Sequence, residues 1–111
     1  MCDMFSKAEK FNQQIGSWDT SNVNDMSDMF HGTSNFNQDI GDGWDTSKVI
    51  NMRGMFYYAK NFNQIISKWN TSKVINNEDM FHGANNFNMK TIKWNTSKVA
   101  IMSDDEEDLF Y

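Results

Sequence analysis

Apolar side chains in the second quarter of the chain follow the spacing of one helix face. The stripe has members at i, i+3, i+7 and i+10, which are Val23, Met26, Phe30 and Thr33, and Met29 lies beside Phe30. This spacing predicts a short α-helix with that face buried. The helix is expected to begin near Ser21 or Asn24, because either side chain can cap the free amides at a helix start.

The segment from residue 36 to residue 46 is too short and too rich in glycine for a second helix. It contains Ile40 and Trp44 and is followed by the turn-like sequence Asp45-Thr46-Ser47. We therefore predict a loop, then a short strand around Trp44, and then a turn that leads into the next helix.

The whole pattern occurs four times along the chain. Met-Phe pairs lie at residues 4–5, 29–30, 55–56 and 80–81, and Thr-Ser pairs lie at 20–21, 46–47, 71–72 and 96–97. The period is therefore 25 or 26 residues, and the extra residue falls in Gly41-Asp42-Gly43, as expected of a surface turn. We expect one repeat domain over residues 1–111, with turns at approximately 1–22, 23–48, 49–73 and 74–98 and a C-terminal capping helix at 99–111.

The order of these residues resembles a known short repeat. Over one period it is Val-x-x-Met-x-x-Met-Phe-x-x-Ala-x-x-Phe-Asn-Gln-x-Ile-x-x-Trp-Asp-Thr-Ser, and it covers residues 1–102. It is similar to the repeat of the BspA-like leucine-rich-repeat surface proteins of bacteria, which also occurs in mycoplasma lipoproteins and in some giant-virus and algal proteins. The resemblance implies a right-handed solenoid with a surface or adhesive role and no catalytic residues. The chain departs from the pattern at Asn77, at Thr33, and at Thr91 and Ile92.

Stacking of such repeats places recurring residues in columns. We predict an α/β fold, a leucine-rich-repeat-like solenoid of about four turns with one short parallel strand and one short helix in each turn. Structural columns are expected for the aromatic residues Trp18, Trp44, Trp69, Trp94, Phe11, Phe36, Phe62, Phe87, Phe30, Phe56 and Phe81. The asparagines of the Phe-Asn pairs are expected to form an amide ladder, and they are Asn12, Asn37, Asn63 and Asn88.

Charge and composition narrow the function. The 111 residues include 10 Lys plus Arg and 15 Asp plus Glu, a net charge of −5, which argues against a nucleic-acid or anionic-membrane surface. No apolar run approaches the roughly 20 residues of a membrane span. No secretory signal is recognisable at the start, which stands against the cell-surface location that the resemblance implies. Cys2 is the only cysteine and occupies a variable repeat position, so neither a disulfide nor a functional thiol is expected.

Three columns admit both a functional and a structural interpretation. The tryptophans suit a sugar-binding platform, but their periodicity favours core packing. His31 and His82 share a repeat position and suggest a metal site, yet they lie two turns apart, roughly 10 Å, so we expect neither metal nor cofactor. The lysine column is a candidate binding face for sulfate or phosphate, although lysines of this kind more often solvate a turn; it comprises Lys48, Lys73 and Lys98.

No catalytic constellation is recognisable, and the acidic run at residues 104–108 is typical of a solvated end. We predict a non-enzymatic module that binds a protein or glycan, or is displayed on a surface, in an adhesive role. The alternatives are a structural spacer within a longer array and, less favoured, a metal-binding protein.

Asn70-Thr71-Ser72 and Asn95-Thr96-Ser97 match the glycosylation pattern, which we ascribe to Asp/Asn exchange in a turn. The first turn lacks a polar cap, which predicts end-to-end self-association.

Overall fold

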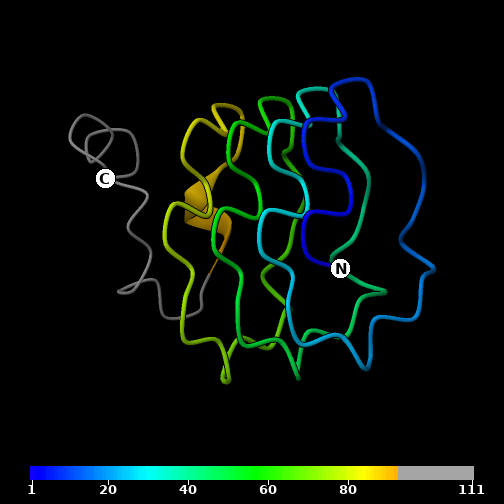
Figure 1. The fold of residues 1–111 in the computed structure, drawn as a ribbon, viewed down its shortest axis with the longest axis vertical. Coiled ribbons are helices and arrows are strands. Elements are labelled where there is room, and N and C mark those ends of the chain that lie inside the picture. The colour runs from blue at the N-terminus through cyan, green and yellow to red at the C-terminus, as the bar shows by residue number, and fades with distance from the viewer. Residues whose placement is uncertain (93–111) are drawn as a thin grey trace.

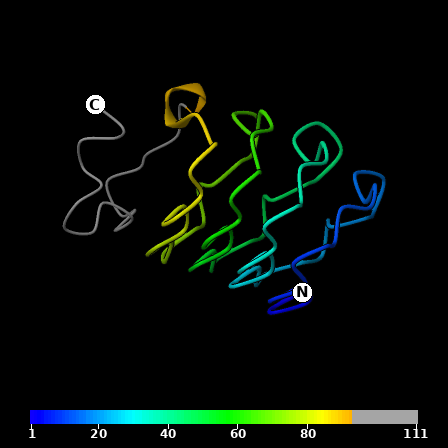
Figure 2. The same cartoon turned by 90° about the horizontal axis from the view of Figure 1, so that it is seen from above.

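The chain winds into coils that lie side by side, and each coil holds one copy of the repeat (Figure 1). The structure is a computed structural model and describes residues 1–92. We number the coils 1 to 4 for residues 1–22, 23–48, 49–73 and 74–92. Seen from above, equivalent segments of successive coils run in the same direction across the stack (Figure 2). Trp94, Lys98 and the expected capping helix at 99–111 lie outside the described residues.

The predicted α/β architecture is wrong. Within residues 1–92 the only helix is η1, a 3-10 helix at Met89–Thr91. Among residues 1–92, the β-bridges between coils are two isolated parallel ones, Asp25 with Asn51 and Asn51 with Asn76. The turns thus have neither the α-helix expected over the apolar stripe nor the strand expected around the tryptophan, and the leucine-rich-repeat plan does not describe them.

Left-handed backbone at two positions of every coil prevents the helix. Asp28 has φ 53° and Gly32 has φ 74°, and both lie inside the stripe that predicted a helix. A right-handed helix cannot contain such residues, because their backbone turns the opposite way. The same two positions are left-handed in the other coils, at Asp3, Lys7, Gly54, Tyr58, Asp79 and Gly83.

Alternation of the backbone hydrogen bonds explains why the stripe looks helical. Every second amide of coil 2 donates to a carbonyl of coil 3 at 2.7–2.9 Å, and these donors are Met26, Asp28, Phe30 and Gly32. The amides between them, at Met29, His31 and Thr33, each donate to the carbonyl three residues earlier. The segment is therefore a series of β-turns. Successive turns start two residues apart, but the first and last residues of one turn lie three apart. Met26 and Met29 are such a pair, as are Phe30 and Thr33, and all four are buried, which gives the i, i+3 spacing of a helix face.

Asparagine and aspartate start many of these turns. The side-chain oxygen of Asp19, Asp45 or Asn70 accepts the backbone N–H two residues later, at 2.9–3.0 Å. A second set, at Asp25, Asn51 and Asn76, does the same at 2.9–3.1 Å. Such Asx-turns replace the helix cap that was expected near Ser21 or Asn24.

Two ladders of phenylalanine rings run through the core. Phe5, Phe30, Phe56 and Phe81 form one ladder, with ring centroids 5.5–5.8 Å apart. Phe11, Phe36, Phe62 and Phe87 form the other, with centroids 5.6–5.9 Å apart. Within each coil the two rings stack at 4.0–4.4 Å. Each coil therefore completes its apolar core only with its neighbours.

The predicted tryptophan and asparagine columns occupy different parts of the stack. Trp44 and Trp69 are buried, with centroids 6.3 Å apart, and their ring N–H groups donate to backbone carbonyls of the preceding coil at 3.0 Å. Trp18 is half-buried. The asparagines lie on the surface, where the side-chain oxygen of each accepts the backbone N–H of the next; the four are Asn12, Asn37, Asn63 and Asn88. The hydrogen bonds of this ladder thus link an asparagine side chain to the backbone of the next asparagine, and not one side-chain amide to another.

The outer side of coil 1 has no neighbour among the described residues. Met4 is 51 % exposed, whereas the equivalent Met29, Met55 and Met80 are completely buried. The contrast shows how much of this methionine side chain a neighbouring coil covers. End-to-end association through the outer side of coil 1 stays a prediction. The described residues contain no helix that is long and apolar enough to cross a membrane.

A polar substitution in the methionine column leads to a stability prediction. Asn77 takes the place held by Met26 and Met52 in the preceding coils, is buried, and its Oδ1 has no hydrogen-bond partner in the described structure. An unpaired buried amide costs about 1–3 kcal/mol. We expect Asn77→Met to raise the free energy of unfolding by about that amount in urea melts. Asn85→Met, at an exposed position of the same coil, should change it by less than about 0.5 kcal/mol, and equal effects at both sites would contradict this account.

The Asx-turns lead to a prediction about pH. Hydrogen bonds from the Ser21 hydroxyl and Ser21 backbone N–H lower the pKa of Asp19, and bonds from Ser47 likewise lower the pKa of Asp45. Because the folded pKa lies below the unfolded value of about 3.9, these carboxylates stabilise the fold above that pH, and the contribution is lost as the pH falls. The double variant Asp19→Asn/Asp45→Asn gives both turns the residue type that Asn70 supplies in coil 3. It should therefore lose less stability than the parent between pH 6 and pH 3 in urea melts. Parallel losses would refute the assignment.

Candidate functional site

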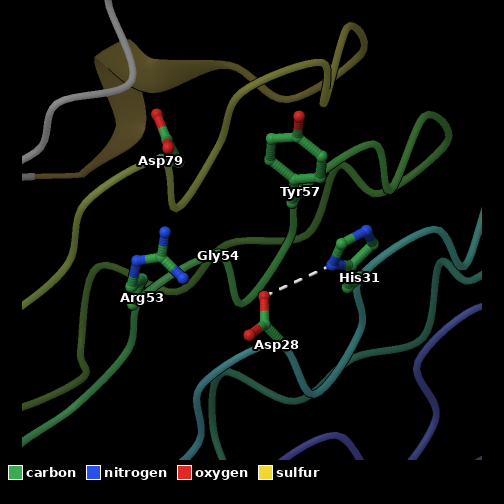
Figure 3. A pocket seen from close by; sticks show the side chains of 6 residues that line it. All are labelled: Asp28, His31, Arg53, Gly54, Tyr57 and Asp79. Atoms are coloured by element: carbon green, nitrogen blue, oxygen red, sulfur yellow. Dashed lines mark hydrogen bonds and ion pairs between the residues drawn. The ribbon is translucent and has the colours of Figure 1, made fainter.

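A hollow of about 240 Å³ lies on the side of coils 2, 3 and 4 (Figure 3). Its floor is backbone that is fixed by the bonds between coils, since the Asp28 amide donates to the Arg53 carbonyl at 2.8 Å and the Gly54 amide donates to the Glu78 carbonyl at 2.9 Å. The side chains on its rim therefore start from well-defined positions. The lining residues are Asp28, His31, Arg53, Gly54, Tyr57 and Asp79.

Gly54 opens the hollow, because it interrupts a column of aspartates. The equivalent residues are Asp3, Asp28 and Asp79, and all four positions are left-handed. A β-carbon on Gly54 would collide with Oδ1 of Asp28. The Asp28 carboxylate thus occupies the space that a side chain at position 54 of the next coil would fill.

Two rim side chains are held by polar neighbours. Asp28 Oδ1 lies 3.3 Å from Nδ1 of His31, three residues later in the same coil. Nε of Arg53 lies 3.4 Å from Oε1 of Glu78 in the next coil. The second pair is about half exposed on both sides, so it contributes little to stability and acts mainly to orient the guanidinium.

A short stack of rings borders the hollow. The Tyr57 ring lies between two imidazoles, with centroids 4.7 Å from His31 and 5.1 Å from His82. Tyr58 meets both Tyr57 and His82 edge-on. His82 stacks on the Tyr57 ring at an interplanar angle of 16°, whereas the His31 ring is tilted by 57° against it.

Asp79 is the one rim side chain whose carboxylate has no hydrogen bond or ion pair with the rest of residues 1–92. It is half-buried at the equivalent position to Asp28, two coils further on. Figure 3 shows Asp79 and Arg53 on one side of the hollow, with His31 and Tyr57 on the other. The rim therefore combines carboxylate acceptors with guanidinium and ring donors.

A second, more open hollow of about 440 Å³ lies beside the first, and His31 lines both. It is lined by residues of coils 1 to 3, among them the charged Lys7, Glu9 and Lys60. The two hollows thus form one uneven polar surface that a ligand longer than a single group can follow.

His31 lines the hollow, and the other residues that the sequence singled out lie elsewhere among residues 1–92. The recurring aromatic residues are in the core or at its edge, and the asparagine ladder lines neither hollow. Lys48 and Lys73 are exposed, and Nζ of Lys48 lies 3.3 Å from Oδ1 of Asn22, so that the column is continued through a hydrogen bond. The hollow is instead lined by residues that vary between repeats, and the change from Asp to Gly54 was the signal available in the sequence.

The histidine pair is interrupted by an aromatic ring. His31 and His82 do share a column, and Tyr57 stacks between them. Residues 1–92 contain no group of three or more His, Cys, Asp or Glu side chains placed to hold a metal ion.

Comparison with known proteins assigns a family. The family model described as Mycoplasma protein of unknown function, DUF285, matches residues 1–42 and 41–105, so the chain belongs to this family. No curated protein matches the chain, and no solved structure does.

The position of Gly54 leads to a prediction about the rim. Gly54→Ala and Gly32→Ala both place a β-carbon on left-handed backbone, and each should cost about 1–2 kcal/mol in urea melts. Only Gly54→Ala should also push Asp28 away from His31, because the β-carbon at Gly32 meets ordinary contacts with Lys7. The ring resonances of His31 in NMR spectra should therefore shift in Gly54→Ala and not in Gly32→Ala. An unchanged His31 in Gly54→Ala would show that the carboxylate does not occupy this space.

Proposed function

We propose that this DUF285 chain is a non-enzymatic binding module, of the kind displayed on a surface, whose ligand is a protein or a glycan. The difference between recurring and variable residue positions supports this proposal. Recurring Met, Phe, Ile and Trp residues fill the core, whereas the hollow is lined by positions that differ from coil to coil. In repeat proteins a constant core with a variable side face is the usual basis of recognition.

Two sets of equivalent positions, compared across the four coils, provide the main support for this proposal. Residues Cys2, Ser27, Arg53 and Glu78 are equivalent, and their chemistry changes in every coil. A second position holds three residue types in four coils, at Ser6, His31, Tyr57 and His82. Because the coil-to-coil bonds fix the spacing of these side chains, the variation changes the surface without changing the scaffold. A surface role agrees with the predicted adhesive character, and the structural spacer and the metal-binding protein remain the alternatives to be tested.

Binding to a defined panel tests the proposal. The purified chain is immobilised and exposed to purified oligosaccharides, glycoproteins and deglycosylated forms of those glycoproteins. Arg53→Ala should weaken the binding of a ligand by at least about fivefold, which corresponds to about 1 kcal/mol. The double variant Lys48→Ala/Lys73→Ala, which removes the other candidate face, should leave binding unchanged. The opposite pattern would move the site to the lysine column.

Two further outcomes would overturn the proposal itself. Failure to bind any member of the panel would favour the structural spacer. A stoichiometric metal retained after dialysis would favour the metal-binding protein. Because Arg53, Lys48 and Lys73 are exposed, their variants should keep the parent's stability to within about 0.5 kcal/mol, which urea melts check.

A further inference from the structure

We propose that the hollow over Gly54 binds one uncharged saccharide ring, with its hydroxyl groups recognised by Asp79 and Arg53. This inference rests on the proposed binding function and names the chemical class of its ligand. It follows from the size of the hollow, from the charges on its rim, and from the way that neighbouring side chains hold the rim in place.

The size limits the ligand to one small group. Pockets for drug-sized molecules are typically about 300–1,000 Å³, and this hollow of about 240 Å³ lies below that range. It opens to solvent on the side of the stack, and the neighbouring hollow of about 440 Å³ begins at His31. A single ring can therefore occupy the hollow while the remainder of a longer ligand extends past His31.

The rim carries charges of both signs. An anion would face the carboxylates of Asp28 and Asp79, and a cation would face the guanidinium of Arg53. An apolar group would leave Asp79 without the hydrogen bonds that it makes to water. A hydroxyl group meets both needs, because it donates to a carboxylate and accepts from a guanidinium.

The rim is already arranged for such hydrogen bonds. Glu78 engages Nε of Arg53, which leaves the terminal N–H groups for a ligand. His31 engages Asp28, and the imidazoles of His31 and His82 hold the Tyr57 ring between them. Asp79 lies on the same side of the hollow as Arg53 (Figure 3). Arg53, Asp28 and Tyr57 are thus oriented before binding, and side chains of this kind lose less conformational entropy when the ligand arrives.

The test is a titration of the full chain, followed by NMR, with methyl glycosides of uncharged hexoses and N-acetylhexosamines. Charged glycosides and free amino acids form parallel series. We expect at least one uncharged glycoside to shift the amide resonances of residues 53–57 and 79. Asp79→Asn should weaken its binding about tenfold, as expected for the loss of one hydrogen bond to a charged group.

Matched variants separate the site from the fold. Asp3→Asn makes the same change at the equivalent left-handed position of coil 1, outside the hollow, and should leave binding unchanged. Asparagine tolerates left-handed backbone, so Asp79→Asn should fold like the parent. Gly54→Ala should abolish binding by filling the floor, whereas Gly32→Ala carries the same backbone strain and should retain it.

The remaining outcomes discriminate this inference from the proposed function. Unchanged binding in Asp79→Asn, or a preference for charged glycosides or amino acids, would overturn the inference. A protein that binds equally well after deglycosylation, with no glycoside binding, would also overturn it and leave the binding module standing. Failure of every glycoside and every protein would overturn both. Binding to a glycoprotein that disappears on deglycosylation, together with free glycoside binding, would support the inference and identify a protein-linked source.

Discussion

The structure depends on one alternation in the backbone hydrogen bonds. Within the repeated segment, every second amide donates to the next coil, and the amides between them close β-turns within the coil. Two left-handed residues, four positions apart, bend the chain so that both sets of bonds form. No coil satisfies its backbone alone, so the stack is the smallest unit in which these polar groups are paired.

The side chains that fill the stack follow from this backbone. Turn corners point the same residues inward in every coil, and the rings of neighbouring coils therefore stack almost face to face, as Phe30, Phe56 and Phe81 do at interplanar angles of 4–7°. The bonds between coils also fix the lateral spacing of the outward side chains. Asp and Asn side chains start the bends by accepting backbone N–H groups in Asx-turns. Many of the polar residues of the chain therefore have a structural role around the aromatic core.

The candidate site arises where the repeat is broken. Glycine replaces aspartate at position 54, and the hollow appears at that point in an otherwise continuous column. Arg53 and Tyr57 then occupy positions that hold other residue types in the adjacent coils. The regular backbone supplies the rigid support. The hollow combines two members of the recurring aspartate column, Asp28 and Asp79, with residues at positions that differ between coils, such as Arg53 and Tyr57.

The sequence by itself determined the period and the residues that recur at equivalent positions. It did not distinguish a helix from a series of β-turns, because both bury residues three or four apart; the bonds that decide between them join residues about 25 positions apart. The left-handed positions carried a local signal in Gly32, Gly54 and Gly83. The hollow was decided by tertiary structure alone, since only the register of the coils brings side chains from three repeats around Gly54.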